Sequence, residues 1–203
     1  MTSTELSRNS RVTPPPALMT AEELLTYPEP DNKRTELVRG RLVVREPPGM
    51  YHGEYAARVV MAIGTYLIHD QAARGAEQTR GRVLTCDPGF TLARNPDTVR
   101  APDVAYVSRA RWAGPMPHGY GEFAPDLAVE IQSPNDRPGA VLAKIGDWLN
   151  AGALLVWVID PIRRAVAVYR ADGSHAVLDD TESLNGGDVL PGFTYAVAEL
   201  LAE

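Results

Sequence analysis

The sequence predicts an α/β fold in which a mixed central β-sheet is flanked by helices. Two stretches with apolar residues at helical spacing, 52–74 and 138–150, alternate along the chain with several short β-rich runs. Between them, residues 125–133 (PDLAVEIQS) alternate between two faces and are apolar enough for a central strand. A chain of 203 residues is long enough for one core and short for two. We therefore expect a single domain over residues 18–203.

The N-terminal part of the chain is predicted to form a tail, a short helix and a hairpin. Residues 1–17 are polar and rich in proline, so we expect a disordered or extended tail. Thr20 is a good N-cap and Glu23 follows three residues later, which is the capping-box pattern of a helix start. Residues 34–46 (RTELVRGRLVVRE) then form two β-rich pieces about an Arg-Gly pair. This predicts an additional N-terminal β-hairpin.

The rest of the chain alternates between helices and strands. The first long helix, from about His52 to Arg74, is indicated by apolar residues at helical spacing: Val59, Val60, Ile63, Tyr66 and Leu67. A β-rich stretch follows (GRVLTCD, FTLAR, APDVAYVS) and leads into PDLAVEIQS. The second helix, about Pro138 to Asn150, ends near Gly152, a natural C-terminal cap position. LLVWVID and RAVAVYRA then form a strand pair, and YAVAELLAE forms a short helix.

Composition narrows the classes of protein. A net charge of −6 argues against a protein that coats nucleic acid through bulk electrostatics. The segment from Arg74 to Arg111 nevertheless holds seven arginines against four acids. It could form a local phosphate-facing patch or, alternatively, arginine-rich solvated strands and loops. One cysteine and four scattered histidines offer no zinc cluster, and we expect Cys86 to be a buried small residue.

The sequence predicts a cytoplasmic protein without a membrane partner. The first ten residues are polar and no apolar stretch follows them, unlike a signal peptide. The longest apolar runs have the length of strands, so no transmembrane helix is expected. A single cysteine cannot form an internal disulfide, which suits a reducing compartment. No organic cofactor is expected.

Polar residues in apolar surroundings mark a candidate site. Asp103 stands beside a β run, and Glu130 and Gln132 share one face of the PDLAVEIQS strand. A carboxylate in such a strand is costly to bury unless it is paired, hydrogen-bonded or bound to a metal. Lys144 borders the apolar stripe of the second helix, in a chain with two lysines and eighteen arginines. Because lysine is a compact charge with an adjustable pKa, this suggests a role that arginine cannot fill.

Two carboxylates and a lysine suit the hydrolysis of phosphodiesters assisted by a divalent metal. Mg²⁺ takes oxygen ligands and keeps several waters, so one or two carboxylates suffice. Such a metal polarises a phosphoryl oxygen and lowers the pKa of a bound water, while a nearby lysine orients that water and stabilises charge. From the residues alone there is an alternative, in which Asp103 and Glu130 simply pair with arginines at the edge of the sheet.

A resemblance to a known family is carried by the string APDVAYVS … PDLAVEIQSPNDRPGAVLAKIGDWLNAGALLVWVIDPIRRAVAVYR. It is similar to the Uma2 (Uma-two) family of predicted restriction endonucleases, which belongs to the PD-(D/E)XK nuclease superfamily. TAEELLTYPE, TELVRGRLV, the His52 helix and LPGFTYAVAEL also fall where that family has similar elements, so the likeness covers nearly everything after residue 18. It implies a restriction-endonuclease-like core, DNA as partner and Mg²⁺ or Mn²⁺ as cofactor.

The resemblance also implies roles for individual residues. Asp103 and Glu130 match the two acids of the motif, both metal ligands, and the backbone carbonyl of Ile131 is implied as a further ligand. The lysine that usually follows two residues after the second acid is replaced here by Gln132. Some superfamily members supply this lysine from the following helix, where Lys144 lies. Gln132 and Lys144 are therefore expected near the attacking water.

Two further candidates and two competing interpretations remain open. Glu36 matches an acid common in the family and His52 a histidine at the start of its long helix, so both are candidate catalytic residues. Alternatively, Glu36 is a solvated strand residue and His52 a surface residue. The glutamine at position 132 also allows a non-catalytic binding module or a homodimer on the nuclease scaffold. A third interpretation is hydrolysis of a small phosphorylated molecule.

Overall fold

The computed structural model describes residues 17–28, 33–75 and 79–202. The expected tail, residues 1–17, lies outside these ranges except for its last residue. Within them, no helix combines the length and the hydropathy needed to cross a bilayer. The helices are α1 (Ala21–Leu25), α2 (Met50–Arg74), α3 (Pro138–Asn150) and α4 (Val197–Leu200). The strands are β1 (Arg34–Val38), β2 (Arg41–Arg45), β3 (Gly81–Thr85), β4 (Phe90–Ala93), β5 (Thr98–Arg100), β6 (Val104–Ser108), β7 (Leu127–Ile131), β8 (Leu155–Asp160), β9 (Ala165–Arg170), β10 (His175–Leu178), β11 (Ser183–Gly186) and β12 (Leu190–Ala196).

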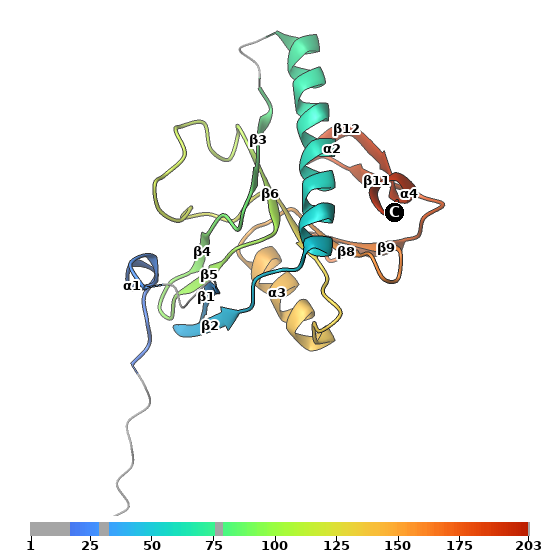
Figure 1. The fold of residues 1–203 in the computed structure, drawn as a ribbon. Helices are drawn as coiled ribbons and strands as arrows, with labels where there is room; N and C mark the ends of the chain where they lie inside the picture. Colours follow the sequence, from blue (N-terminus) through green and yellow to red (C-terminus); the bar gives the residue numbers. More distant parts are fainter. Residues whose placement is uncertain (1–16, 29–32, 76–78, 203) are drawn as a thin grey trace, which may run out of the picture.

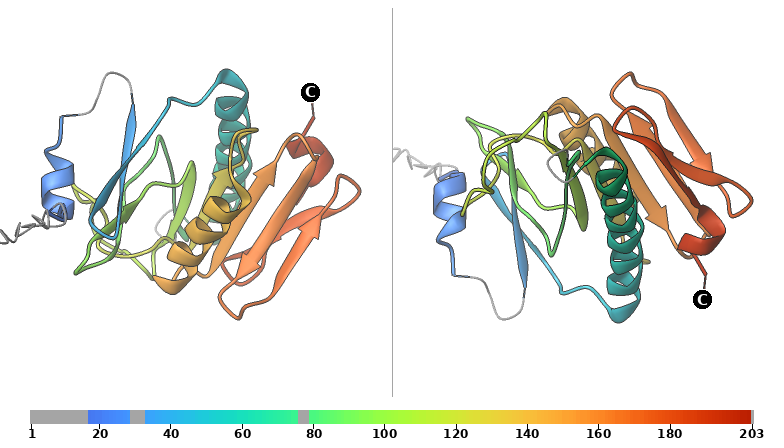
Figure 2. Two further views of the ribbon diagram at one scale, coloured as in Figure 1. Left: turned by 90° about the horizontal axis from the view of Figure 1, so that it is seen from below. Right: turned by 90° about the horizontal axis from the view of Figure 1, so that it is seen from above.

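A six-stranded sheet in the order β10-β9-β8-β7-β6-β3 forms the centre of the fold (Figure 1). β7 and β8 run parallel, whereas the other neighbouring pairs are antiparallel, so the sheet is mixed. α2 and α3 flank this sheet (Figure 2). The predicted α/β class, with a mixed central sheet between helices, is confirmed.

The strand β7 is buried on both of its faces, which explains its nearly continuous apolar sequence. Val129 and Ile131 belong to the core under α2, α4 and β12. Ala128 belongs to the opposite core, where it packs with Trp148 of α3. Because side chains alternate along a strand, Glu130 lies on the same side as Ala128, under α3. The alternation read from PDLAVEIQS therefore brings a carboxylate to the underside of a helix.

The predicted hairpin is part of a second sheet. β1 and β2 pair in antiparallel register about the Arg-Gly turn, and Thr20 and Glu23 form the expected capping box at the start of α1. However, β1 also pairs with β5, so the hairpin belongs to a four-stranded sheet in the order β2-β1-β5-β4. β5 spans only three residues, too few for a periodic pattern to be recognised. The extra sheet forms one wall of the site described below.

Three C-terminal strands were not among the predicted elements. β10 pairs with β9 at the edge of the central sheet, and β11 and β12 form a two-stranded sheet of their own with an irregularity near Asn185. Their sequences are short, or carry glycine and proline inside the strand (HAVL, SLNG, LPGFTYA), which weakens any strand signal. The predicted C-terminal helix is present as α4.

The expectation of a buried Cys86 is wrong, because its side chain is exposed. Cys86 and Asp87 follow β3 with φ angles of 65° and 55°. Two consecutive non-glycine residues in the left-handed region form a tight turn, and a side chain on such a turn is carried away from the core. This turn also brings Asp87 to the site.

Candidate active site

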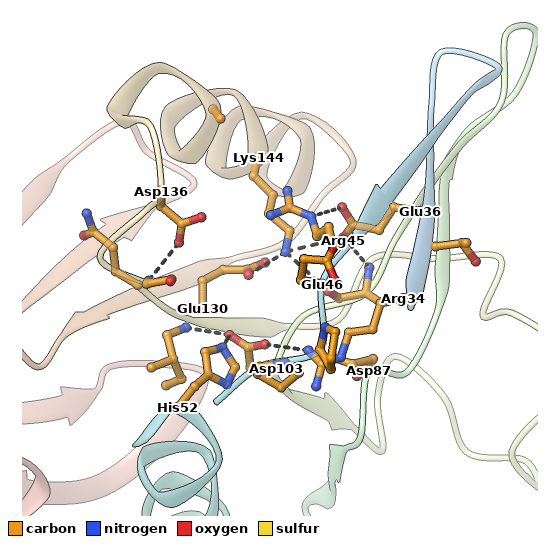
Figure 3. Close-up of a pocket in the computed structure, with 18 of the residues that line it drawn as sticks. Arg34, Glu36, Arg45, Glu46, His52, Asp87, Asp103, Glu130, Asp136 and Lys144 are labelled. Atoms are coloured by element: carbon orange, nitrogen blue, oxygen red, sulfur yellow. Dashed lines mark hydrogen bonds and ion pairs between the residues drawn. The ribbon is translucent and has the colours of Figure 1, made fainter. Parts of the chain in front are cut away.

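A cavity of about 960 Å³ lies between the second sheet, the end of β7 and the first turns of α2 and α3 (Figure 3). The residues that the sequence nominated all line it: Glu36, His52, Asp103, Glu130, Ile131, Gln132 and Lys144. Its wall carries six acids against four lysines and arginines, namely Glu36, Glu46, Asp87, Asp103, Glu130 and Asp136 against Lys33, Arg34, Arg45 and Lys144. This excess of acids favours a cation in the cavity.

Glu130 is held in place from α3. Its Oε2 accepts a hydrogen bond of 2.6 Å from the Lys144 ammonium, and its Oε1 accepts one of 2.8 Å from the indole N–H of Trp148. Burial raises the pKa of the Glu130 carboxyl to about 7; Lys144 opposes this rise, whereas Asp103 and Glu36 add to it. A carboxylate in this position is therefore costly without a further cation.

Asp103 lies next to Glu130 at the ends of two neighbouring strands. Val104 pairs with Val129 in the antiparallel register of β6 and β7, so one residue further along each strand Asp103 faces Glu130. Asp103 Oδ2 accepts the backbone N–H of Ile131 at 2.6 Å. The same Oδ2 is 3.1 Å from His52 Nε2, in the first turn of α2.

Lys144 reaches Glu130 from the helix rather than from the strand. Besides Glu130, its Nζ contacts the carbonyl oxygen of Ala101 at 3.3 Å and Glu36 Oε1 at 3.4 Å. Burial alone would lower the pKa of Lys144, but Glu130, Glu36 and Asp103 outweigh it and raise the pKa, so the amine is charged. Gln132 also lines the cavity, and its backbone N–H donates a hydrogen bond to the carbonyl of Ile159 at 2.8 Å.

Glu36 is buried, with an exposed fraction of 3%. The alternative that it is a solvated strand residue is therefore wrong. Burial would raise the pKa of its carboxyl. However, Lys144, Arg100, Arg45 and the backbone N–H of Ala101 together lower the pKa to about 2. Glu36 Oε2 accepts hydrogen bonds from Arg100 Nη1 at 2.9 Å and from Arg45 Nε at 3.2 Å. Glu36 is therefore an ionised, fully surrounded carboxylate in the wall of the site.

In Glu36→Gln, the free energy of unfolding is expected to fall less on acidification than in the wild type. The folded-state pKa lies below the usual 4.5, so the carboxylate stabilises the protein above that pH and loses this contribution as the pH falls towards about 2. The shift corresponds to roughly 3 kcal/mol of free energy of unfolding at neutral pH. Urea unfolding between pH 7 and pH 3 measures it, with the exposed Glu46→Gln as control. Equal acid losses in wild type and Glu36→Gln would contradict this assignment.

Asp87, Arg34, Arg100 and Asp147 were missed by sequence reasoning. Asp87 lies 2.7 Å from Arg34 Nη1, and the same nitrogen is 3.7 Å from Asp103 Oδ1. Burial raises the pKa of Asp87, against the effect of Arg34. Arg100 and Asp147 form an ion pair of 2.6 Å next to Glu36. No local pattern marks these residues, because they meet only through the pairing of distant elements.

The arginine-rich segment from Arg74 to Arg111 is mostly engaged within the fold. Within the part of the chain that the structure describes, five of its seven arginines form ion pairs, and Arg100 is buried rather than solvated. The pairs are Arg74 and Arg80 with Asp70, Arg94 with Glu22, Asp97 and Glu122, Arg100 with Glu36 and Asp147, and Arg111 with Asp126. The segment thus offers little free charge for a phosphate-facing patch.

The donor set at Asp103 and Glu130 fits a hard divalent cation. In the described ranges, no three His, Cys, Asp or Glu side chains come together as a metal site. Mg²⁺, however, needs only one or two carboxylates and completes its shell with water and substrate phosphate. Among residues 17–28, 33–75 and 79–202, Asp103 Oδ1 has one ion-pair contact, the 3.7 Å approach of Arg34, and each carboxylate oxygen has two lone pairs. Two adjacent carboxylates with spare lone pairs can hold Mg²⁺ or Mn²⁺.

Comparisons with known proteins identify the fold and the family. One solved structure, described as a "putative nuclease belonging to DUF820" from Anabaena variabilis ATCC 29413, has a TM-score of 0.74 and 21% sequence identity to this chain. The match covers 90% of this chain and 97% of that one, and at this identity it shows the fold. A search of curated proteins gives no match. The family model "Uma2: Putative restriction endonuclease" matches residues 21–198, and since this is most of the chain, the protein belongs to the Uma2 family.

Proposed function

We propose that the protein is a metal-dependent endonuclease that hydrolyses phosphodiester bonds in DNA, with residues 18–203 as its single domain. Asp103 and Glu130 would hold Mg²⁺ or Mn²⁺, together with the backbone carbonyl of Ile131. The 2.6 Å contact between Lys144 Nζ and Glu130 Oε2 supports this function most directly. This contact brings Lys144 of α3 to Glu130. Two residues after Glu130, in the usual position of the motif lysine, the chain has Gln132.

The side chains of the site suit the in-line attack of water on a phosphodiester. A bound divalent metal supplies Lewis-acid polarisation of the phosphoryl oxygen and a lowered pKa for its water. Lys144 is charged and can orient that water and balance the charge that develops on the phosphoryl oxygens. Trp148 fixes the second oxygen of Glu130, so the carboxylate keeps one orientation. Gln132 can donate a further hydrogen bond to the water or the phosphate.

The charge of the cavity predicts that DNA binds only after the cation. Six acids against four lysines and arginines repel a phosphate group unless a divalent ion offsets them. We expect weak binding of a labelled duplex in EDTA and much tighter binding in Ca²⁺, which occupies oxygen sites and commonly does not support cleavage. Fluorescence anisotropy at constant ionic strength measures this. Equal affinity in EDTA and Ca²⁺ would contradict DNA binding that depends on a divalent cation.

Cleavage itself tests the function. Supercoiled plasmid incubated with the wild-type protein in Mg²⁺ or Mn²⁺ is expected to be nicked or linearised, and the Glu130→Gln protein is expected to leave it intact. The non-catalytic module predicts DNA or protein binding with no cleavage in either metal. A site for a small phosphorylated molecule predicts no tight DNA binding. DNA affinity that falls steeply with added salt separates the nuclease from that last alternative, because phosphate contacts release counterions.

A further inference from the structure

Five charged side chains of alternating sign link α3 to the central sheet and to the second sheet, and three of them, Glu36, Glu130 and Lys144, line the cavity. Asp147 Oδ2 accepts hydrogen bonds from Arg100 Nε at 2.9 Å and Nη2 at 2.6 Å. Arg100 Nη1 donates to Glu36 Oε2 at 2.9 Å. Glu36 Oε1 lies 3.4 Å from Lys144 Nζ, which donates to Glu130 Oε2 at 2.6 Å. Because Asp147 and Lys144 both belong to α3, the chain of contacts leaves the helix and returns to it.

The spacing on α3 explains how one helix provides both ends of this chain. Lys144, Asp147 and Trp148 are separated by three and four residues, so they lie on one face of the helix. That face is turned to the sheets, because Trp148 is fully buried and Lys144 and Asp147 have side chains that are 12% and 20% exposed. Arg100 on β5 and Glu36 on β1 are buried as well, so each charge depends on its neighbours.

Glu36 has no lone pair left for a metal ion. Four donors surround its carboxylate: Arg45 Nε at 3.2 Å, Arg100 Nη1 at 2.9 Å, the backbone N–H of Ala101 at 3.2 Å and Lys144 Nζ at 3.4 Å. A carboxylate has about four lone-pair sites, so these donors saturate it. Asp103 differs, because within the described part of the chain its Oδ1 has a single ion-pair contact, with Arg34 at 3.7 Å.

A lysine on a helix needs an anchor that a lysine on a strand does not. A lysine at position 132 would be held by the strand ladder two residues from Glu130, on the same face. The place of Lys144, by contrast, depends on how α3 docks and on a flexible four-carbon stem. The Asp147–Arg100 pair joins α3 to β5, and the Lys144 ammonium contacts both Glu36 and Glu130 (Figure 3).

We propose that Glu36, Arg100 and Asp147 are positioning residues for Lys144, and that Glu36 is not a metal ligand. This role deepens the nuclease function proposed above and rests on it for its catalytic meaning. The contacts themselves can be tested without metal or DNA. The three residues thus allow the motif lysine to be supplied from α3 while Gln132 occupies its place on the strand.

The two lysines of the chain provide a direct readout. Acetic anhydride acylates accessible amines, and peptide mass spectrometry compares Lys144 with the more exposed Lys33, whose side chain is 38% exposed. Glu36→Gln and Asp147→Asn are expected to raise the Lys144 to Lys33 labelling ratio several-fold. Asp70→Asn is the matched control, because Asp70 also pairs with two arginines but lies outside the cavity wall, and it is expected to leave the ratio unchanged.

A second readout separates positioning from metal binding. The thermal shift produced by Mn²⁺ is expected to persist in Glu36→Gln and Asp147→Asn, and turnover is expected to fall while DNA affinity in Ca²⁺ is kept. An unchanged labelling ratio in Asp147→Asn overturns the positioning role. This variant decides the test alone if Glu36→Gln does not fold. If the thermal shift by Mn²⁺ is lost in Glu36→Gln but kept in Asp147→Asn, Glu36 is a metal ligand and that part of the proposal is overturned. A wild type that cleaves no DNA refutes the nuclease function, while the labelling ratio still decides the positioning.

Discussion

Glu130→Gln is expected to abolish the stabilisation that Mn²⁺ or Mg²⁺ gives to the native protein. A ligand present at about 100 times its dissociation constant stabilises the folded state by roughly 2.7 kcal/mol, a shift of several degrees in Tm for a domain of this size. The amide keeps one oxygen, which can accept from either Trp148 or Lys144, and its NH2 group then faces the other donor. The metal-free variant is therefore expected to be less stable than the wild type, and the Mn²⁺ shift is compared within each protein. The amide also loses the negative charge that a hard cation requires. Thermal unfolding with and without Mn²⁺ measures the effect.

The same variant is expected to lose cleavage by a factor of about 10² to 10³ or more, as when one transition-state-stabilising group is removed. Glu46→Gln is the matched control, because Glu46 lines the same cavity but has a side chain that is 76% exposed and pairs with Lys33. It should keep both the Mn²⁺ shift and the cleavage. A full Mn²⁺ shift in Glu130→Gln would show that Glu130 is a structural acid and would favour the non-catalytic module.

Much of the central sheet and of the nominated site follows from local patterns. PDLAVEIQS shows a two-sided buried strand and places Glu130 on one face, and the helical spacing of residues 138–150 gives α3 within the observed bounds. The fold class and the family resemblance drawn from these motifs are confirmed. These features could be predicted because each depends on the periodicity of apolar residues within a single element, which is visible in the sequence.

The surroundings of the site could not be predicted in the same way. Arg100 lies on a strand of three residues, and Asp147 is an ordinary polar residue of an amphipathic helix. Their ion pair, and the contact of Glu36 on β1 with Lys144 on α3, arise only when the second sheet closes against the first. Asp87 lies in the site because it belongs to a turn with left-handed backbone, and the residue types around that position do not predict such a turn. Long-range packing, rather than propensity, decides these contacts.

Moving the lysine back to the strand is expected to rescue its loss from the helix. Lys144→Met should reduce cleavage by about 10² to 10³ because the charge next to Glu130 is removed. Gln132 lines the cavity and shares the face of Glu130, so a lysine there has its ammonium within reach of the same carboxylate. The Lys144→Met/Gln132→Lys protein should therefore regain at least a tenth of the lost rate, measured as single-turnover cleavage in Mn²⁺.

The control for this rescue is Lys144→Met/Asn150→Lys, which restores the net charge at the far end of α3, outside the cavity wall. It should stay as inactive as Lys144→Met, because orientation of the water requires the ammonium at Glu130 and a distant charge is screened by solvent. Full cleavage by Lys144→Met would remove the lysine from the mechanism. Rescue by both second substitutions would show that the ammonium supplies only net charge, whereas rescue by Gln132→Lys alone would make the helix and the strand alternative sources of one catalytic group.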